Sequence, residues 1–128
     1  MKRNVVGTKG AQLDLLIKQG STFSFKATIS DKNNSAMNLT GASFSGMIRK
    51  SWNSVPIIVS VSTIITNATA GMVEISLSSS QTGAMAAGED ERDENSQYVW
   101  DYELLDSTGK ITPIFYGNVS VFREITKP

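Results

Sequence analysis

The stretch Gln97–Leu105 constrains the fold of this chain more than any other part of the sequence. Its large apolar side chains fall on every second position, at Tyr98, Trp100, Tyr102 and Leu104. A period of two is that of a β-strand with one buried face. Three of the five Trp and Tyr residues of the chain lie on that face. We therefore expect this strand to supply the centre of a hydrophobic core.

Similar alternation recurs along the chain, separated by turn-forming residues. The further segments that we expect to be strands lie at about 13–17, 23–29, 42–50, 57–65, 72–77 and 111–122. Only 79–87 is typical of a short helical turn, which either Ser79 or Ser80 would cap and Gly88 would end. The pattern predicts an all-β fold, an antiparallel immunoglobulin-like β-sandwich of 7–8 strands. A small barrel is the alternative.

The last predicted strand contains two residues that weaken a regular ladder. Pro113 cannot donate a backbone hydrogen bond, and Gly117 brings no side chain to the sheet. We expect an edge position, a β-bulge or two short strands there. The preceding turn, Asp106–Gly109, suits a hairpin loop with Gly109 at positive φ.

The composition excludes several classes of chemistry. The chain has no histidine and no cysteine, which rules out Ser-His-Asp and Cys-His catalysis and thiolate or imidazole metal sites. We expect no enzyme, no cofactor and no metal site. Twelve basic and twelve acidic residues cancel, which argues against nucleic-acid binding. No apolar run approaches the roughly 20 residues of a membrane-spanning helix, so we expect no membrane partner.

The charges are unevenly distributed along the chain. Residues 1–50 hold eight Lys or Arg against two Asp, and residues 51–128 hold four against ten Asp or Glu. Neighbouring strands could bring the two sets together on one surface; alternatively, copies of the molecule stack head to tail or dock on a charged partner. We interpret 1–11 as a flexible basic N-terminal arm and 12–126 as a single β-sandwich domain.

Three segments are candidate contacts with a partner protein. Trp52 lies in a loop, either as an exposed interface anchor or as a lid over the core. The arm contributes three basic residues, Lys2, Arg3 and Lys9. The run at 89–95 contributes five carboxylates, Glu89, Asp90, Glu91, Asp93 and Glu94. Their spacing fits no EF-hand, so a solvated loop is favoured over a calcium site.

The order of motifs resembles a family of small β-sandwich proteins from tailed bacteriophages. The opening Leu13–Phe23 is similar to their L-x-I-x-Q-G-x-T-F strand pair. The similarity continues through Asn38–Ala42, Met47–Lys50, Gly71–Ser78, Thr82, Tyr98–Leu104, Gly109, Gly117–Val121 and Thr126, and so spans about residues 12–126. The domains concerned resemble the N-terminal domain of phage baseplate upper proteins and fibre-attachment proteins. The run at 89–95 departs from them, since a shorter loop is expected there.

The resemblance implies a structural role in the virion, after assembly in the host cytoplasm. A symmetric homo-oligomer would connect tail, baseplate, neck or fibre components as an adaptor, because the chain ends directly after the sandwich. A capsid decoration or head-fibre protein is one alternative. A carbohydrate-binding module is another, with Trp52, Tyr98 and Tyr116 as candidate aromatic contacts. Asp101 and Glu103 share a strand face, but outward sheet faces normally carry such charges, so we do not interpret them as a catalytic pair.

Overall fold

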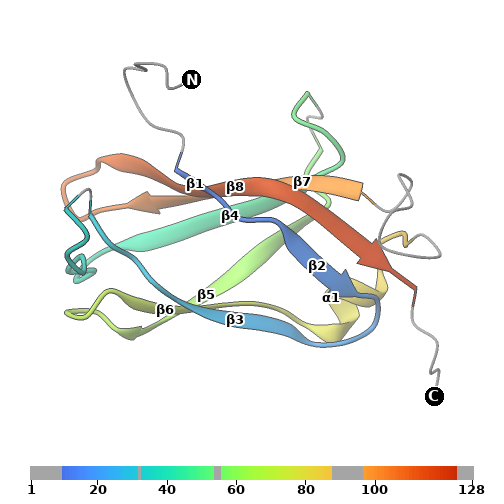
Figure 1. Ribbon diagram of the computed structural model, residues 1–128, viewed down its shortest axis with the longest axis horizontal. Coiled ribbons are helices and arrows are strands. Elements are labelled where there is room, and N and C mark those ends of the chain that lie inside the picture. The colour runs from blue at the N-terminus through green and yellow to red at the C-terminus, as the bar shows by residue number, and fades with distance from the viewer. Residues whose placement is uncertain (1–9, 32, 54–55, 88–96, 124–128) are drawn as a thin grey trace.

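The computed structural model describes residues 10–31, 33–53, 56–87 and 97–123, and it is mostly β (Figure 1). The elements are β1 (Ala11–Gln12), β2 (Leu15–Lys18), β3 (Phe23–Thr28), β4 (Ser43–Arg49), β5 (Val59–Asn67), β6 (Met72–Leu77), α1 (Ser79–Gly83), β7 (Gln97–Leu105) and β8 (Ile111–Phe122). The all-β fold class is therefore confirmed. Ala11, the last residue of the expected arm, belongs to strand β1.

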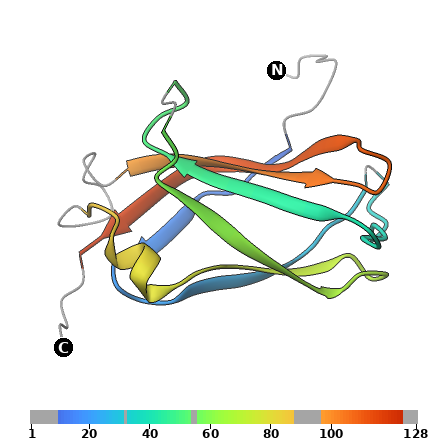
Figure 2. The ribbon, with the colours of Figure 1, turned by 180° about the vertical axis from the view of Figure 1, so that it is seen from behind.

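All the strands belong to one sheet, which curls into a half-barrel. The order is β1-β8-β7-β4-β5-β6-β3, and β2 also pairs with β8. The curl arises at β5, whose residues Val59–Val61 pair with β4 while Ser62–Asn67 pair with β6 (Figure 2). The expected sandwich of two separate sheets is thus replaced, in the strand pairing, by one continuous sheet.

The first two strands correct the expectation of a purely antiparallel arrangement. Both β1 and β2 run parallel to β8, with Ala11 opposite Phe115 and Ile17 opposite Val121. The chain is kinked between them at Leu13 and Asp14. There the Leu13 amide donates to the Tyr116 carbonyl oxygen at 2.8 Å. The sequence of a strand does not indicate whether it pairs parallel or antiparallel with a distant strand. The alternation of apolar and polar residues is the same in parallel and antiparallel pairing.

Gly117 of β8 makes this kink possible. Its neighbour Asn118 donates a backbone hydrogen bond to the Asp14 carboxylate at 2.9 Å, where a regular ladder would use a carbonyl oxygen. A Cβ atom at position 117 would collide with the Leu13 carbonyl oxygen and the Asp14 carboxylate. A glycine is therefore required here because two segments of the chain approach closely, and not because of its own dihedral angles. The irregularity expected in β8 is a bulge beside Pro113, where the register with β7 shifts between Tyr102 and Glu103.

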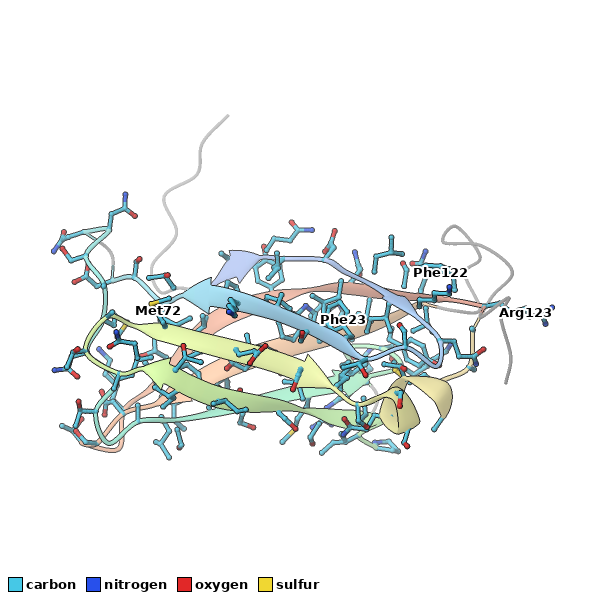
Figure 3. All side chains as sticks on the ribbon, turned by 90° about the horizontal axis from the view of Figure 1, so that it is seen from below. Phe23, Met72, Phe122 and Arg123 are labelled. Carbon is cyan, nitrogen blue, oxygen red and sulfur yellow. The ribbon has the colours of Figure 1, made fainter. Side chains whose placement is uncertain are left out.

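The core fills the inside of the half-barrel. Aromatic rings from both arms of the curl meet there: Phe25 of β3 lies edge-on to Trp100 at 6.5 Å, and Phe44 stacks on Tyr102 at 5.1 Å. Gly46 leaves room for the Tyr102 ring, since a Cβ atom there would lie 2.6 Å from Tyr102 Cδ1. Figure 3 shows the outer side of β3, β6 and β5, with Phe23 and Met72 toward opposite ends of the β3–β6 pair.

The short helix α1 lies at one end of the half-barrel (Figure 1). It is capped by Ser78 rather than by Ser79 or Ser80, in a reciprocal capping box with Gln81. It ends at Gly83, earlier than expected. The buried Thr82 hydroxyl accepts from the Gly20 amide at 3.1 Å and donates to the Ser21 carbonyl at 2.7 Å. α1 therefore fastens the turn between β2 and β3.

The hairpin between β7 and β8 forms as expected. Gly109 has a φ of 92°. The Asp106 carboxylate accepts hydrogen bonds from the Thr108 amide and hydroxyl and from the Lys110 amide, at 2.9, 2.6 and 3.0 Å. The Thr108 hydroxyl, then the Lys110 amide, hold the pKa of Asp106 below its ordinary value. One carboxylate thus organises this turn.

Candidate functional site

The inner face of β7 is structural. Tyr98, Trp100, Tyr102 and Leu104 are all buried, as the alternation predicts. Each polar atom on this face has a partner. The Trp100 indole N–H donates to the Leu13 carbonyl oxygen at 2.7 Å, the Tyr98 hydroxyl donates to the Ala86 carbonyl oxygen at 3.0 Å, and the Tyr102 hydroxyl lies 2.6 Å from Thr63 Oγ1. No face of this aromatic stripe is left for a ligand.

Burial changes the acidity of two tyrosines on this stripe. Removal from water raises the pKa of Tyr102 to about 12, against a smaller opposing effect of the Thr63 hydroxyl. Removal from water also raises the pKa of Tyr98, whose hydrogen bond to Ala86 acts in the opposite direction. Both hydroxyl groups therefore stay protonated at neutral pH and act as hydrogen-bonding core groups.

The outer face of the same strands carries a pocket that includes Trp52. Its volume is about 430 Å³. The outward residues that line it come from three elements: Trp52 from the loop between β4 and β5, Asp101 and Glu103 from β7, and Pro113 and Tyr116 from β8. The Trp52 side chain is 59% exposed. Trp52 is therefore exposed and is not a lid over the core.

Strand register explains why these side chains meet. Asp101 lies opposite Met47 of β4 on one side and Tyr116 of β8 on the other, and Tyr116 in turn lies opposite Gln12 of β1. Residues directly opposite share a face, so these four form one row across four strands. Glu103 lies one pleat further along β7, opposite Ser45 and Pro113.

Of the predicted contact residues, only Trp52 lies in the part of the chain that the structure describes. Lys2, Arg3 and Lys9, and the five carboxylates Glu89, Asp90, Glu91, Asp93 and Glu94, lie outside it. Tyr98, one of the three candidate sugar contacts, is buried, whereas Trp52 and Tyr116 line the same pocket. Period-two spacing placed Asp101 and Glu103 on one face. Nothing in the sequence indicated that the Trp52 loop reaches them.

A second pocket, of about 880 Å³, lies where the half-barrel is open, between the end of β3 and the start of β8. Ile29, Met37, Ile111 and Ile114 contribute apolar lining. Polar groups at its border include Asp31 and Lys110. The lining offers apolar contact and no group of side chains arranged for chemistry.

The described residues also lack the features of a metal site and of a membrane-spanning helix. Among them, no group of three or more acidic side chains could hold a metal ion. No helix in the described ranges is long and apolar enough to cross a bilayer. Comparison of the chain with protein-family models and with curated proteins found no match.

Proposed function

We propose that this chain is a structural protein of a tailed bacteriophage virion, an adaptor that joins tail, baseplate, neck or fibre components by protein–protein contact. The proposal derives from the ordered motifs that resemble such proteins. One observation supports it most. Two of the motifs, far apart in sequence, meet in the structure, because Thr82 accepts a hydrogen bond from Gly20 and donates one to Ser21. Gln19, of the same first motif, donates to the Met85 carbonyl at 2.8 Å.

The finer fold assignment belongs to the same proposal. We infer that the half-barrel is a variant of the immunoglobulin-like sandwich in which β5 joins the two layers. The parallel pairing of β2 with the last strand supports this, as does the contact of Phe25 with Trp100 across the core. A sheet of this kind is rigid, and its outer face and strand edges remain available to neighbours.

Detection in purified particles tests the function. We expect the protein in virions at a copy number that is a multiple of three, six or twelve, and located outside the head. A variant lacking residues 1–9, which leaves β1 intact, should be lost from particles because the basic arm is the proposed contact. Full incorporation of the truncated chain would reject the role of the arm. Absence of the wild-type chain from particles would reject the function.

The same particles separate the alternative roles. A position on the capsid surface would identify a decoration or head-fibre protein in place of a tail adaptor. Binding to a glycan array that is lost on Trp52→Ala would favour a carbohydrate-binding module, because Trp52 and Tyr116 share one pocket. Exposed aromatic side chains are the usual stacking surfaces of such sites.

A further inference from the structure

We propose that the pocket formed by Trp52, Asp101, Glu103 and Tyr116 binds the basic N-terminal segment, residues 1–9, of a second copy of this chain. This inference rests on the proposed adaptor role and names a second copy of the chain as one partner. Self-association can be measured on the purified protein, without virions. The pocket lies over β7 and β8 beside Trp52, and Tyr102 and Phe115 also contribute to its lining. Three properties of the chain carry the inference.

The first property is an uncompensated negative charge. Neither the Asp101 nor the Glu103 carboxylate forms an ion pair or hydrogen bond with another described residue. Their cross-strand neighbours, Met47, Tyr116, Ser45 and Pro113, are uncharged. Positions i and i+2 of a strand are about 7 Å apart along the backbone and point to the same face, so the two carboxylates are neighbours on the outer face. Like charges this close attract a cation to the space between them.

Arg49 is the charged residue of β4 nearest to these carboxylates in register. It lies opposite Val99, one pleat away from Asp101, and its Nη2 donates to Met47 Sδ at 3.5 Å. On this side, Asp101 and Glu103 lie directly opposite the uncharged residues Met47 and Ser45.

The second property is the aromatic wall. A Lys or Arg side chain can lay its methylene groups and its charge against an exposed indole while its polar end reaches a carboxylate. The chain already uses this chemistry elsewhere, since Lys50 Nζ lies 4.8 Å from the centroid of the Tyr98 ring. A neutral sugar would stack on Trp52 equally well and could donate hydroxyl hydrogen bonds to the carboxylates, but it would bring no positive charge to offset theirs. The charges therefore favour a cationic peptide.

The third property is the segment itself. Residues 1–9 carry Lys2, Arg3 and Lys9, and no acidic residue precedes Asp14. Nine residues span at most about 30 Å, which sets the limit of the distance from Gly10 at which the segment can make contact. The contrast between a basic first part and an acidic second part of the chain makes the start of one copy complementary to the pocket of another. Such head-to-tail contacts repeat and produce rings or open chains.

Sedimentation velocity on the full-length chain tests this at low and at moderate salt. We expect concentration-dependent association that weakens with salt. Asp101→Asn combined with Glu103→Gln should reduce the association constant about tenfold or more, and Trp52→Ala should do likewise. The matched control is Glu74→Gln, which removes one carboxylate from the outer face of β6, opposite Lys26. It should leave association unchanged.

A charge exchange distinguishes a second copy from the chain's own arm. One variant carries Asp101→Lys and Glu103→Lys, and the other carries Lys2→Glu, Arg3→Glu and Lys9→Glu. Each should be monomeric alone, and their mixture should associate. All of these positions are in the arm or on the outer face, and circular dichroism checks that each variant folds.

Three results would overturn the inference: a wild-type chain that is monomeric at all concentrations, association unaffected by the pocket variants, or a charge-exchanged mixture that stays monomeric. Glycan binding at Trp52 by a monomeric wild-type chain would make the pocket a sugar site instead. A monomer that still enters particles would refute self-association and leave the virion proposal standing.

Discussion

Tyr102 carries its hydroxyl group into a core from which water is excluded. The hydroxyl has one protein partner, Thr63 Oγ1 at 2.6 Å, and the ring is enclosed by Phe44, Trp100 and Phe115. Burial of a phenol costs little free energy while the group is neutral and hydrogen-bonded. Burial of the ionised phenolate costs much more. At the scale of single residues, the stability of this protein therefore depends on uncharged aromatic groups that keep their polar atoms satisfied.

Alkaline titration should reveal this dependence. Because burial raises the pKa of Tyr102 to about 12, the native state resists the loss of this proton, whereas the unfolded chain loses it near pH 10. The stabilising contribution is fully present below pH 10 and is lost as the pH rises toward 12. We expect the tyrosinate absorbance to show a late step, and Tyr102→Phe should remove the contribution of Tyr102 to it. Titration of every tyrosine near pH 10 in the folded protein would contradict this.

A second prediction for a single residue concerns the effect of a larger side chain at Gly46 on stability. A methyl group there would press on the Tyr102 ring and on Val61, both held by a packed core. We expect Gly46→Ala to lower the free energy of unfolding by about 1–3 kcal/mol, measured by denaturant titration. Ser45→Ala, on the outward side of the same strand, is the control and should change it by less than about 0.5 kcal/mol. Equal stability of the two variants would show that the ring has room to move.

At the scale of elements, α1 is too short to be stable by itself. Its capping box orders the first turn, and its buried Thr82 ties it to the turn between β2 and β3. The helix and that turn therefore depend on each other, although about 60 residues separate them in the chain.

The variant Thr82→Val tests the contact between α1 and the turn that joins β2 to β3. Valine keeps the shape of threonine but leaves the Gly20 amide and the Ser21 carbonyl without their partner. We expect the free energy of unfolding to fall by about 1–3 kcal/mol, with faster amide hydrogen exchange at Gly20. Thr82→Ser keeps the hydroxyl, so its free energy of unfolding should fall by clearly less. If the two variants lower the free energy of unfolding equally, packing of the Thr82 methyl group, and not its hydrogen bonds, holds the helix in place.

The elements themselves were largely predictable from the sequence, and their arrangement was not. Alternation at Tyr98–Leu104 and at Phe23–Ile29 identified strands and their buried faces, because period two is a local property. The parallel pairing of β2 with β8, and the division of β5 between β4 and β6, depend on contacts between distant segments. For the same reason, the sequence singled out Trp52 but did not predict its pocket with Asp101 and Glu103.

At the scale of the molecule, the half-barrel separates two surfaces made by the same strands. The inner surface gathers Tyr98, Trp100 and Tyr102, and the outer surface carries Asp101 and Glu103 from the same β7 beside Trp52. One strand thus builds the core with its even-numbered positions and presents charge with its odd-numbered ones. Because the aromatic stripe is buried on the inner face, only the outer face of β7 remains for recognition.

Tryptophan fluorescence tests that claim directly, since the chain has only two tryptophans. Trp100 is 1% exposed and Trp52 is 59% exposed. In Trp52→Phe, where Trp100 is the single emitter, we predict blue-shifted emission that acrylamide barely quenches. The wild type should show an additional, readily quenched component from Trp52. Red-shifted and strongly quenched emission from folded Trp52→Phe would place the β7 stripe at the surface and contradict the account.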